Sequence, residues 1–527
     1  MSCLSIYNKV FMKLILPVLF CFFLYIGCGN NTNTEIIAHK STLHTPGQKT
    51  ELFGWENPEN RRLFIESIRN SEKEGLFPDD YSLKKLEKLE ESYSTLSEKE
   101  IEGYYKQLSS SFIKYTSNLA NGKLNPREIY PDWEIKKNKF KGDSILSTAL
   151  AKNKIDSVIE SCKPKHAIYA YLKKALAVVN ALPDENFTPI ATTDKFDFGD
   201  KGKNIVLIKK RLQYWDDLSK NDTLNEVYNE AMHDAVKKFQ SRHGLEPDGV
   251  IGKGTIAALN FTKTQRKQQI IDNLERWRWF PRDLGINHIV VNIPDFYLHA
   301  VQNTDTIKTH RVVVGTEKRK TPILSSRIDN IVFNPTWTVP PTILKEDLIP
   351  GTQKSRNYIT SRNITIYNRK GEEVSLGNWS FSNAENYRYV QSPGEDNALG
   401  FVKINFPNSH LVYLHDTNHR DYFVKNFRAL SSGCVRVENP LNLAEYLLFS
   451  KKIYTPEKID SILFLKKTKT VKIEEEFDVH ILYFTAWYAK GQLQFRNDVY
   501  NYDPELYLRL SNQFRSNLVT SARVINK

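Results

Sequence analysis

The sequence predicts a multidomain α+β protein, with helical domains in its first half and a mostly β domain in its second half. A chain of 527 residues is too long for one hydrophobic core and predicts about three domains. Apolar residues recur every three or four positions within residues 97–119 and 165–182, which is the helical period. Beyond residue 287, short runs rich in Val, Ile, Phe and Tyr favour strands.

Residues 1–27 have the composition of an export signal. Two lysines precede residues 14–27, an apolar run of 14 that matches a signal peptide and is shorter than the ~20 residues of a membrane span. The run ends beside Cys28, where the sequence resembles a bacterial lipoprotein cleavage site with Cys28 as the lipidated residue. An uncleaved anchor is the alternative, and a compact signal could also start at Met12. With polar residues 28–54 as a tether, we expect an exported protein anchored to a membrane at its periplasmic face.

Cysteine and charge content restrict the classes of function. If Cys28 is lipidated and Cys3 and Cys21 are removed with the signal, only Cys162 and Cys434 remain, and no disulfide framework is implied. No Cys/His cluster has zinc spacing, so we expect no metal and no cofactor. The net charge of +13 suits anionic membranes or a carboxylate-rich cell wall. Nucleic acid is a weaker interpretation, because no nucleic-acid motif is present.

Residues 55–195 are predicted to form an α-helical scaffold domain. Ser97 and Glu100 match a capping box, and an apolar stripe follows them from Ile101 to Leu119. A second stripe lies between Lys165 and Leu182 and stops at a proline. We interpret both stripes as core positions and not as a cofactor site.

Residues 196–262 are predicted to form a small separate domain. One helix would pack Val236 and Phe239 inward, a loop rich in glycine would follow, and a second helix would run from Gly254 to Leu259. This segment resembles the small three-helix peptidoglycan-binding module. The resemblance implies attachment to the cell wall, and a purely structural spacer is the alternative.

Residues 265–510 are predicted to form a mostly β domain with a polar and aromatic insertion at about residues 340–400. The runs that predict strands are residues 288–293, 296–301, 311–315 and 331–333, and residues 479–500 would complete the domain.

A base and a thiol lie 19 residues apart in this domain. His415 follows a predicted strand at residues 411–414, and Cys434 follows a tight Ser-Ser-Gly loop. A Cys attacks a carbonyl carbon as its thiolate, so it needs an imidazole nearby to take the proton. A helix over residues 421–430 and a hinge at Gly433 would bring the two side chains together. The alternative is a small buried Cys, a satisfied His and an ordinary turn.

The residues after Cys434 extend this pattern. Residues 435–437 predict a short strand, and Asn439 followed by Pro440 predicts the N-cap and first residue of a helix through Leu447. The chain would thus run out from His415 and return beside the same strand end.

The strings His-Asp-Thr from residue 415 and Ser-Ser-Gly-Cys-Val-Arg-Val from residue 431 resemble the signature of the L,D-transpeptidases, which have a YkuD-type catalytic domain. His415, Gly433, Cys434 and Arg436 fall on the family's positions, whereas Ser432 stands where many members carry a second His. Three further segments resemble the large branch of the family, which has a helical scaffold and a peptidoglycan-binding domain: residues 391–394, 397–400 and 407–408. In that branch the region about 340–400 forms a mobile lid, and an ordinary surface insertion is the alternative.

The resemblance implies an L,D-transpeptidase that forms 3–3 cross-links in peptidoglycan. His415 would deprotonate Cys434, and the thiolate would attack the bond between diaminopimelate and D-Ala in a donor tetrapeptide. An acceptor diaminopimelate amine would then resolve the thioester. The order of His before Cys argues against a papain-like or NlpC-type hydrolase, and their short separation argues against a sortase. An L,D-carboxypeptidase and a catalytically silent wall-binding scaffold are the remaining alternatives.

The residues around the nucleophile have expected roles in this chemistry. Backbone N–H groups at Gly433 and Cys434 are the natural oxyanion donors, with the Tyr413 hydroxyl as a helper and Ser432 beside them. Arg436 could bind a substrate carboxylate, or form a structural ion pair. Carbapenems are expected to acylate Cys434.

Overall fold

The computed structural model describes residues 54–449, 452–489 and 491–512. The predicted signal peptide and the lipidation residue Cys28 lie outside these residues. Among the described residues, no helix has the length and apolar character needed to cross a membrane.

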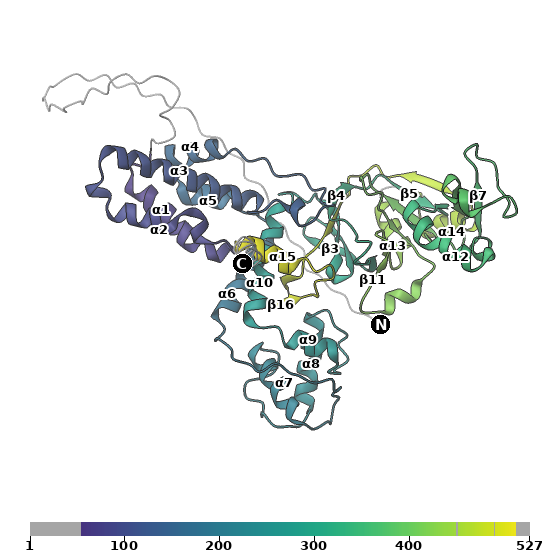
Figure 1. Cartoon of the computed structure of the whole chain (residues 1–527), viewed down its shortest axis with the longest axis horizontal. Helices are drawn as coiled ribbons and strands as arrows, with labels where there is room; N and C mark the ends of the chain where they lie inside the picture. The colour runs from purple at the N-terminus through teal and green to yellow at the C-terminus, as the bar shows by residue number, and fades with distance from the viewer. Residues whose placement is uncertain (1–53, 450–451, 490, 513–527) are drawn as a thin grey trace, which may run out of the picture. The chain divides into compact units, whose positions relative to one another are not determined.

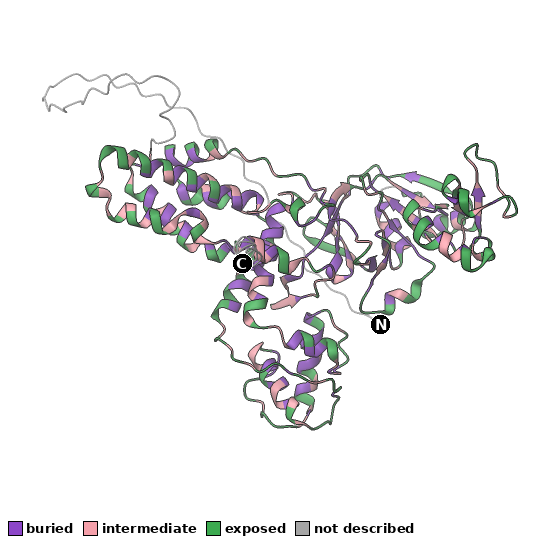
Figure 2. Ribbon diagram, viewed as in Figure 1, coloured by how far each residue is buried: buried purple, intermediate pink, exposed green. Residues whose placement is uncertain are grey.

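Five helices of the first domain pack into a bundle (Figure 1). They are α1 (Pro58–Arg69), α2 (Leu83–Glu91), α3 (Glu98–Asn121), α4 (Gly142–Ala151) and α5 (Ile155–Cys162). Their apolar faces meet in a shared core that includes Phe64 and Phe112, whose ring centroids lie 5.3 Å apart, and the outer faces are exposed (Figure 2). The predicted capping box at the start of α3 is confirmed, because Ser97 N donates to Glu100 Oε2 at 2.8 Å and Glu100 N donates back to Ser97 Oγ.

Helix α6 (Ala167–Ala181) has the predicted buried stripe, but it packs outside the bundle core. Its apolar face contacts α10 (Lys263–Trp279), and both helices share a core with the β domain. Helix α10 is polar in sequence and yet buried along most of its length, including Arg276 and Arg278. By packing, the bundle therefore ends near Cys162.

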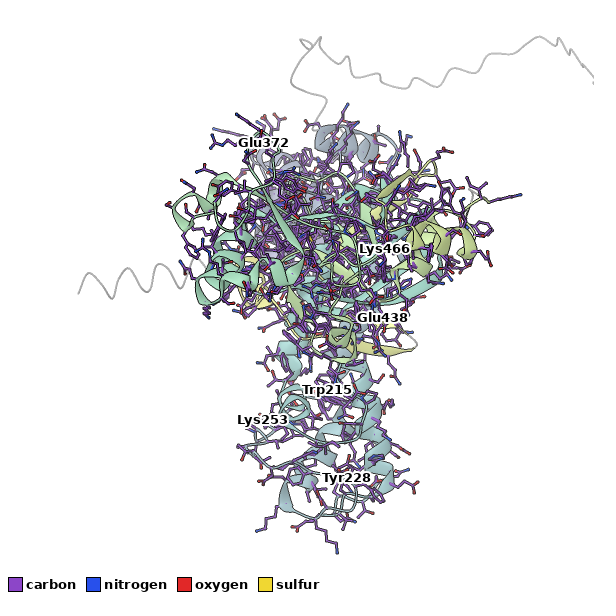
Figure 3. All side chains as sticks on the ribbon, turned by 90° about the vertical axis from the view of Figure 1, so that its right-hand side faces the viewer. Trp215, Tyr228, Lys253, Glu372, Glu438 and Lys466 are labelled. Carbon is purple, nitrogen blue, oxygen red and sulfur yellow. The ribbon has the colours of Figure 1, made fainter. Side chains whose placement is uncertain are left out.

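The small second domain contains α7 (Lys203–Tyr214), α8 (Glu230–Arg242) and α9 (Lys253–Leu259), so the predicted three-helix module is confirmed. Figure 3 marks it with Trp215, Tyr228 and Lys253. Val236 and Phe239 are fully buried in its own core. Gly249 has a left-handed φ of 80°, and its N–H donates to Gln240 Oε1 at 2.9 Å, which ties the loop to α8.

The β domain is built on an 11-stranded sheet in the order β13-β5-β9-β10-β12-β3-β2-β1-β14-β4, with β11 paired to β3. These strands are β1 (Asn287–Asn292), β2 (Tyr297–Gln302), β3 (Asp305–Gly315), β4 (Leu324–Arg327), β5 (Asn330–Phe333), β9 (Val402–Asn405), β10 (Leu414–His415), β11 (Ala429–Ser431), β12 (Val435–Val437), β13 (Lys469–Lys472) and β14 (Asp478–Leu482). Around it lie α13 (Pro440–Leu447), α14 (Pro456–Phe464), α15 (Asp503–Leu510) and the hairpin β15 (Ala486–Ala489) with β16 (Gln492–Phe495). The prediction of helical domains followed by a mostly β domain is confirmed.

The insertion folds around a core of its own. It contains the three-stranded sheet β6 (Trp337–Thr338), β8 (Arg388–Gln391) and β7 (Ile364–Tyr367), the helices α11 (Pro341–Ile343) and α12 (Ile349–Lys354), and between these helices a π-helical turn, η6 (Leu344–Leu348). Trp379 and Tyr389 are buried in this core, and Trp379 Nε1 donates to the Tyr389 hydroxyl at 2.6 Å. Glu372, labelled in Figure 3, lies on this insertion.

Two local predictions near the nucleophile are wrong. Residues 421–430 do not form a helix, because only a 3-10 turn, η10 (Arg420–Val424), precedes β11. Phe423 is buried, but Val424 and Phe427 are exposed, so only part of the apolar spacing packs against a core. A short helix without a continuous packed face is marginal. Asn439 precedes α13 as predicted, but it has a left-handed φ of 49° and its side chain makes no cap.

The strand before His415 is also shorter than predicted. Only Leu414 and His415 pair as β10. Leu411 has a left-handed φ of 55° and is 80 % exposed, so it lies in a turn at the surface.

Candidate active site

Three neighbouring strands place one row of charged and titratable side chains on the same face of the sheet. His415 on β10 pairs with Lys403 on β9 and with Arg436 on β12. Residues that pair across a sheet share a face and lie about 4.8 Å apart. The imidazole of His415 therefore stands between two cations.

A second row of side chains, two residues earlier along the chain, contains the thiol. Val435 N donates to Tyr413 O at 3.2 Å, which sets Tyr413 beside Cys434. Because side chains two residues apart on a strand share a face, Tyr413 and Cys434 lie on the face of His415 and Arg436. Burial, followed by the neighbouring Cys434, raises the pKa of the Tyr413 hydroxyl, and the Tyr413 and His415 ring centroids are 5.5 Å apart.

His415 is held as a neutral base. It is 5 % exposed, and its Nδ1 hydrogen-bonds to the backbone oxygen of Asp416, which leaves Nε2 as the proton acceptor. Burial, together with the charges of Arg436 and Lys403, lowers the pKa of His415 to about 3, although the hydrogen bond to the Asp416 carbonyl acts to raise it. The ring is uncharged at neutral pH and can take a proton.

Cys434 is held as a neutral thiol. Burial raises its pKa, although hydrogen bonds with Tyr413 and the charges of Lys403 and Arg436 act in the opposite direction. No hydrogen bond joins the Cys434 and His415 side chains, both of which the structure describes. The resting pair is thus a thiol and an imidazole rather than a thiolate and an imidazolium.

The loop before Cys434 depends on Gly433. This residue has a φ of 116°, which favours glycine, and its backbone is bonded on both sides. Its N–H donates to Ser431 Oγ at 3.1 Å, and its carbonyl accepts from Thr321 Oγ1 at 2.8 Å. Of the two N–H groups expected to bind the oxyanion, that of Gly433 is therefore already bonded. The N–H of Cys434 has no acceptor in the described part of the chain, so it is the one available to the oxyanion.

Ser432 is exposed and connects the nucleophile loop to the insertion through Arg319. Arg319 Nη1 donates to Ser432 Oγ at 2.9 Å and to Asp347 Oδ2 at 2.8 Å, and Arg319 Nε donates to Glu346 Oε2 at 2.9 Å. Both carboxylates lie on η6 and raise the pKa of Arg319, Asp347 more than Glu346. No signal in the sequence pointed to Arg319, because it precedes Ser432 by 113 residues.

These side chains open into a cleft of about 990 Å³. The insertion contributes one wall through Trp337, Pro340 and Ile343. The segment before α4 contributes Asp132, so residues far from the β domain in sequence reach the cleft. Glu134 fixes that segment, since its N–H donates to Ile323 O at 3.3 Å and its carboxylate accepts from Ser409 N at 3.2 Å.

Arg436 and Lys403 line the cleft without a carboxylate partner among the described residues. Arg436 Nε and Nη1 are buried and make no hydrogen bond. Burial lowers the pKa of both cations. Arg436 was expected either to bind a substrate carboxylate or to form a structural ion pair. Among the described residues no carboxylate forms that ion pair.

Cys162, the other described thiol, lies outside the cleft. Cys162 is buried on α5, and its Sγ donates to Val158 O at 3.3 Å. In the described part of the chain, no group of three or more His, Cys, Asp or Glu residues could hold a metal ion.

Comparisons with known proteins agree with this domain plan. The L,D-transpeptidase catalytic domain family, YkuD, matches residues 286–473. A scaffold domain family matches residues 50–176, and a peptidoglycan-binding domain family matches residues 201–259. Residues 286–473 are thus similar to the L,D-transpeptidase catalytic domains, and the resemblance to that family and to the three domain types expected from the sequence is confirmed.

A curated relative supports the same family. The Haemophilus influenzae protein named "Putative L,D-transpeptidase" is 38% identical over 244 residues, which cover 46% of this chain and 49% of the relative. The alignment thus spans about half the length of that protein.

Solved structures of similar proteins include two L,D-transpeptidases. The one from Xylanimonas cellulosilytica is 14% identical, covers 55% of this chain and 98% of its own, and has a TM-score of 0.18. The one from Stackebrandtia nassauensis is 16% identical, covers 56% and 97%, and has a TM-score of 0.20.

Proposed function

We propose that this protein is an L,D-transpeptidase that forms 3–3 cross-links in peptidoglycan through a thioester on Cys434. One observation carries the proposal: a neutral imidazole on β10 and a thiol directly before the parallel strand β12 line the same cleft of a YkuD-type domain. Both groups are in the protonation states from which general-base catalysis starts.

The acylation step uses His415 as base and then as acid. Nε2 of His415 takes the proton from Sγ of Cys434, and the thiolate attacks the carbonyl between diaminopimelate and the terminal D-Ala. The oxyanion receives hydrogen bonds from the Cys434 N–H and the Tyr413 hydroxyl, each worth about 3 kcal/mol in the transition state. The C–N bond breaks as His415 returns the proton to the departing amine.

The second step restores the enzyme. An acceptor diaminopimelate amine attacks the thioester, His415 takes the proton of that amine, and Cys434 leaves as a thiol. The unpaired Arg436 binds a carboxylate of the stem peptide, because two of its buried N–H-bearing nitrogens lack a protein partner. Water in place of the amine would make the protein an L,D-carboxypeptidase.

Mass spectrometry of the protein with a diaminopimelate-containing tetrapeptide tests this function. We expect an adduct equal to the tetrapeptide minus D-Ala on Cys434, and the same sulfur should be acylated by a carbapenem. Cys434→Ala should abolish both adducts, whereas Cys162→Ala is the matched control and should keep them. An adduct on Cys162, or none on a folded protein, contradicts the proposal. With an acceptor stem added, a cross-linked dimer indicates transfer, and a free tripeptide alone indicates hydrolysis.

We further propose that the chain is exported and carries lipid on Cys28 at the periplasmic face. Intact-mass analysis should find a mature chain that begins at an acylated Cys28, and an upstream N-terminus or the absence of lipid contradicts this.

The module of α7, α8 and α9 is proposed to hold the protein on sacculi. Deleting residues 196–262 should weaken pelleting with isolated peptidoglycan and leave chemistry on soluble stems partly intact. Unchanged pelleting would make the module a spacer.

A further inference from the structure

Lys403 is a cation beside the reacting groups, and neither acylation nor transfer of the acyl group uses it. It lies opposite His415 in the register of β9 and β10, so its side chain shares the face of Tyr413 and Cys434. Its Nζ is 4.0 Å from the centre of the Tyr413 ring, and the backbone of Tyr413 bonds to Val435, the residue after Cys434. Lys403 is thus fixed in the cleft within electrostatic range of the sulfur.

No counter-charge for Lys403 exists in the described part of the chain. Its ammonium group makes no ion pair and no hydrogen bond there, and the Tyr413 ring compensates a desolvated cation only in part. On the other side of His415, Nε and Nη1 of Arg436 are also buried without a hydrogen-bond partner. A buried charge without a partner is unfavourable, so this arrangement is typical of a site whose counter-charge arrives with the ligand.

The reaction itself brings a carboxylate to this position. His415 must give its proton to the nitrogen of the departing D-Ala, so that nitrogen lies next to Nε2 in the transition state. The carboxylate carbon of an α-amino acid is two bonds from its nitrogen, roughly 2.5 Å away. Lys403 faces His415 on the neighbouring strand, and neighbouring strand backbones lie about 4.8 Å apart. Its long side chain on the same face can therefore reach the D-Ala carboxylate.

We propose that Lys403 binds the terminal carboxylate of the donor peptide and so selects donors that end one residue after the scissile bond. This inference rests on the proposed function and adds the group that recognises the leaving residue. A longer donor would carry its carboxylate beyond Lys403, and a donor blocked at its C-terminus would leave the ammonium group unpaired.

Two donors that differ only at the C-terminus test the inference: the tetrapeptide as free acid, and the same peptide ending in D-alaninamide. Acylation of Cys434 is followed by mass, and kcat/KM is measured for each donor. We expect the natural protein to prefer the acid by on the order of 10- to 100-fold, as for one hydrogen bond to a charged group. Lys403→Met should remove most of this preference by slowing the acid more than the amide, and Lys403→Arg should keep it.

Lys320→Met is the matched control. Lys320 lines the same cleft, and its Nζ also lies over an aromatic ring, 4.3 Å from the centre of Tyr502. Its loss removes an equal charge from the cleft, so a general electrostatic effect would lower the acid-to-amide ratio in both variants. We expect the ratio to change only in Lys403→Met.

Each other outcome overturns the inference. If Lys403→Met slows acid and amide equally, Lys403 acts through Tyr413 or through packing. If the natural protein accepts both donors equally, no charge is recognised there. If neither donor acylates the natural protein, the proposed function itself fails, which is a separate result.

Discussion

Two groups of buried cations in this protein differ in what surrounds them. Arg276 and Arg278 on α10 are fully buried and paired: Arg276 bonds to Asp503 and to the Tyr130 hydroxyl, and Arg278 Nη1 donates to Glu275 at 2.8 Å. Although burial acts to lower the pKa of both arginines, these partners raise it above its usual value.

Lys403 and Arg436 in the cleft are partly buried without a carboxylate among the described residues, and burial lowers the pKa of both. The paired arginines hold parts of the fold together, since Arg278 also bonds to the backbone of Glu74 near the helical bundle. The unpaired cations face a cleft that contains a thiol. The comparison teaches that in this chain a missing counter-charge, and not a buried charge as such, marks the place for an anionic ligand.

The largest effect should follow the loss of the base between the unpaired cations. His415→Ala should slow acylation by about 10²- to 10⁴-fold, the usual contribution of general acid–base catalysis. The reaction with the tetrapeptide, followed by mass, measures it. Because the buried ring leaves a cavity and the bond to Asp416 is lost, the melting temperature should fall, and the rate is compared at a temperature where the variant is folded. A variant that acylates at the natural rate would show that another group takes the proton.

The paired cations should matter for stability instead. Arg278→Met leaves Glu275, which is 0 % exposed, without its partner, and breaking a buried ion pair lowers the free energy of unfolding by about 3–5 kcal/mol. Arg436→Met is the matched variant in the cleft, and it should change the unfolding free energy by less than about 1 kcal/mol because it removes a charge that has no partner. Urea unfolding measures the free energy of unfolding of both variants. Equal losses would show that the paired arginines of α10 and the unpaired cations of the cleft do not differ in their contribution to stability.

The smallest effect concerns Arg319, which belongs to neither group. It is paired, but its partners Glu346 and Asp347 are 53% and 44% exposed, so solvent weakens each pair to about 1 kcal/mol or less. Arg319→Ala should leave global stability nearly unchanged and increase hydrogen exchange in η6 and α12, because these elements lose their bond to the loop of Ser432. Unchanged exchange there would show that the insertion is held by other contacts. Lys318→Ala, a neighbouring cation that also lines the cleft, serves as the control.

The predictable parts of the fold were those with a strong local pattern. The capping box before α3, the stripe of α6 and the run of α9 each specify a helix within one stretch of chain. The order of His415 before Cys434 and the loop between them were equally local. The helix predicted over residues 421–430 had apolar residues at helical spacing, but only Phe423 is buried and Phe427 is exposed. The sequence of one segment does not show which of its apolar residues will meet a core.

The parts that escaped prediction depend on pairing between distant segments. Lys403 joins the site only because β9 pairs with β10, and Asp132 reaches the cleft only because Glu134 bonds to Ile323 and Ser409. Helix α10 looked polar because its buried charges are matched by residues elsewhere in the chain. A charge and its partner, or the lack of one, cannot be recognised before the fold places them.

The pH dependence of Cys434 alkylation tests the central claim most directly, namely that the cleft at rest holds a neutral pair awaiting an anionic substrate. Iodoacetamide reacts with the thiolate form of a cysteine. The measurement uses the Cys162→Ala variant, in which Cys434 is the one free cysteine left among the described residues. Because burial raises the pKa of Cys434 and keeps His415 neutral, the rate should rise with pH through and beyond about 8.5, the value of an ordinary thiol. A rate that is already on a plateau between pH 5 and 7, in the range expected of a thiolate–imidazolium pair, would contradict the account.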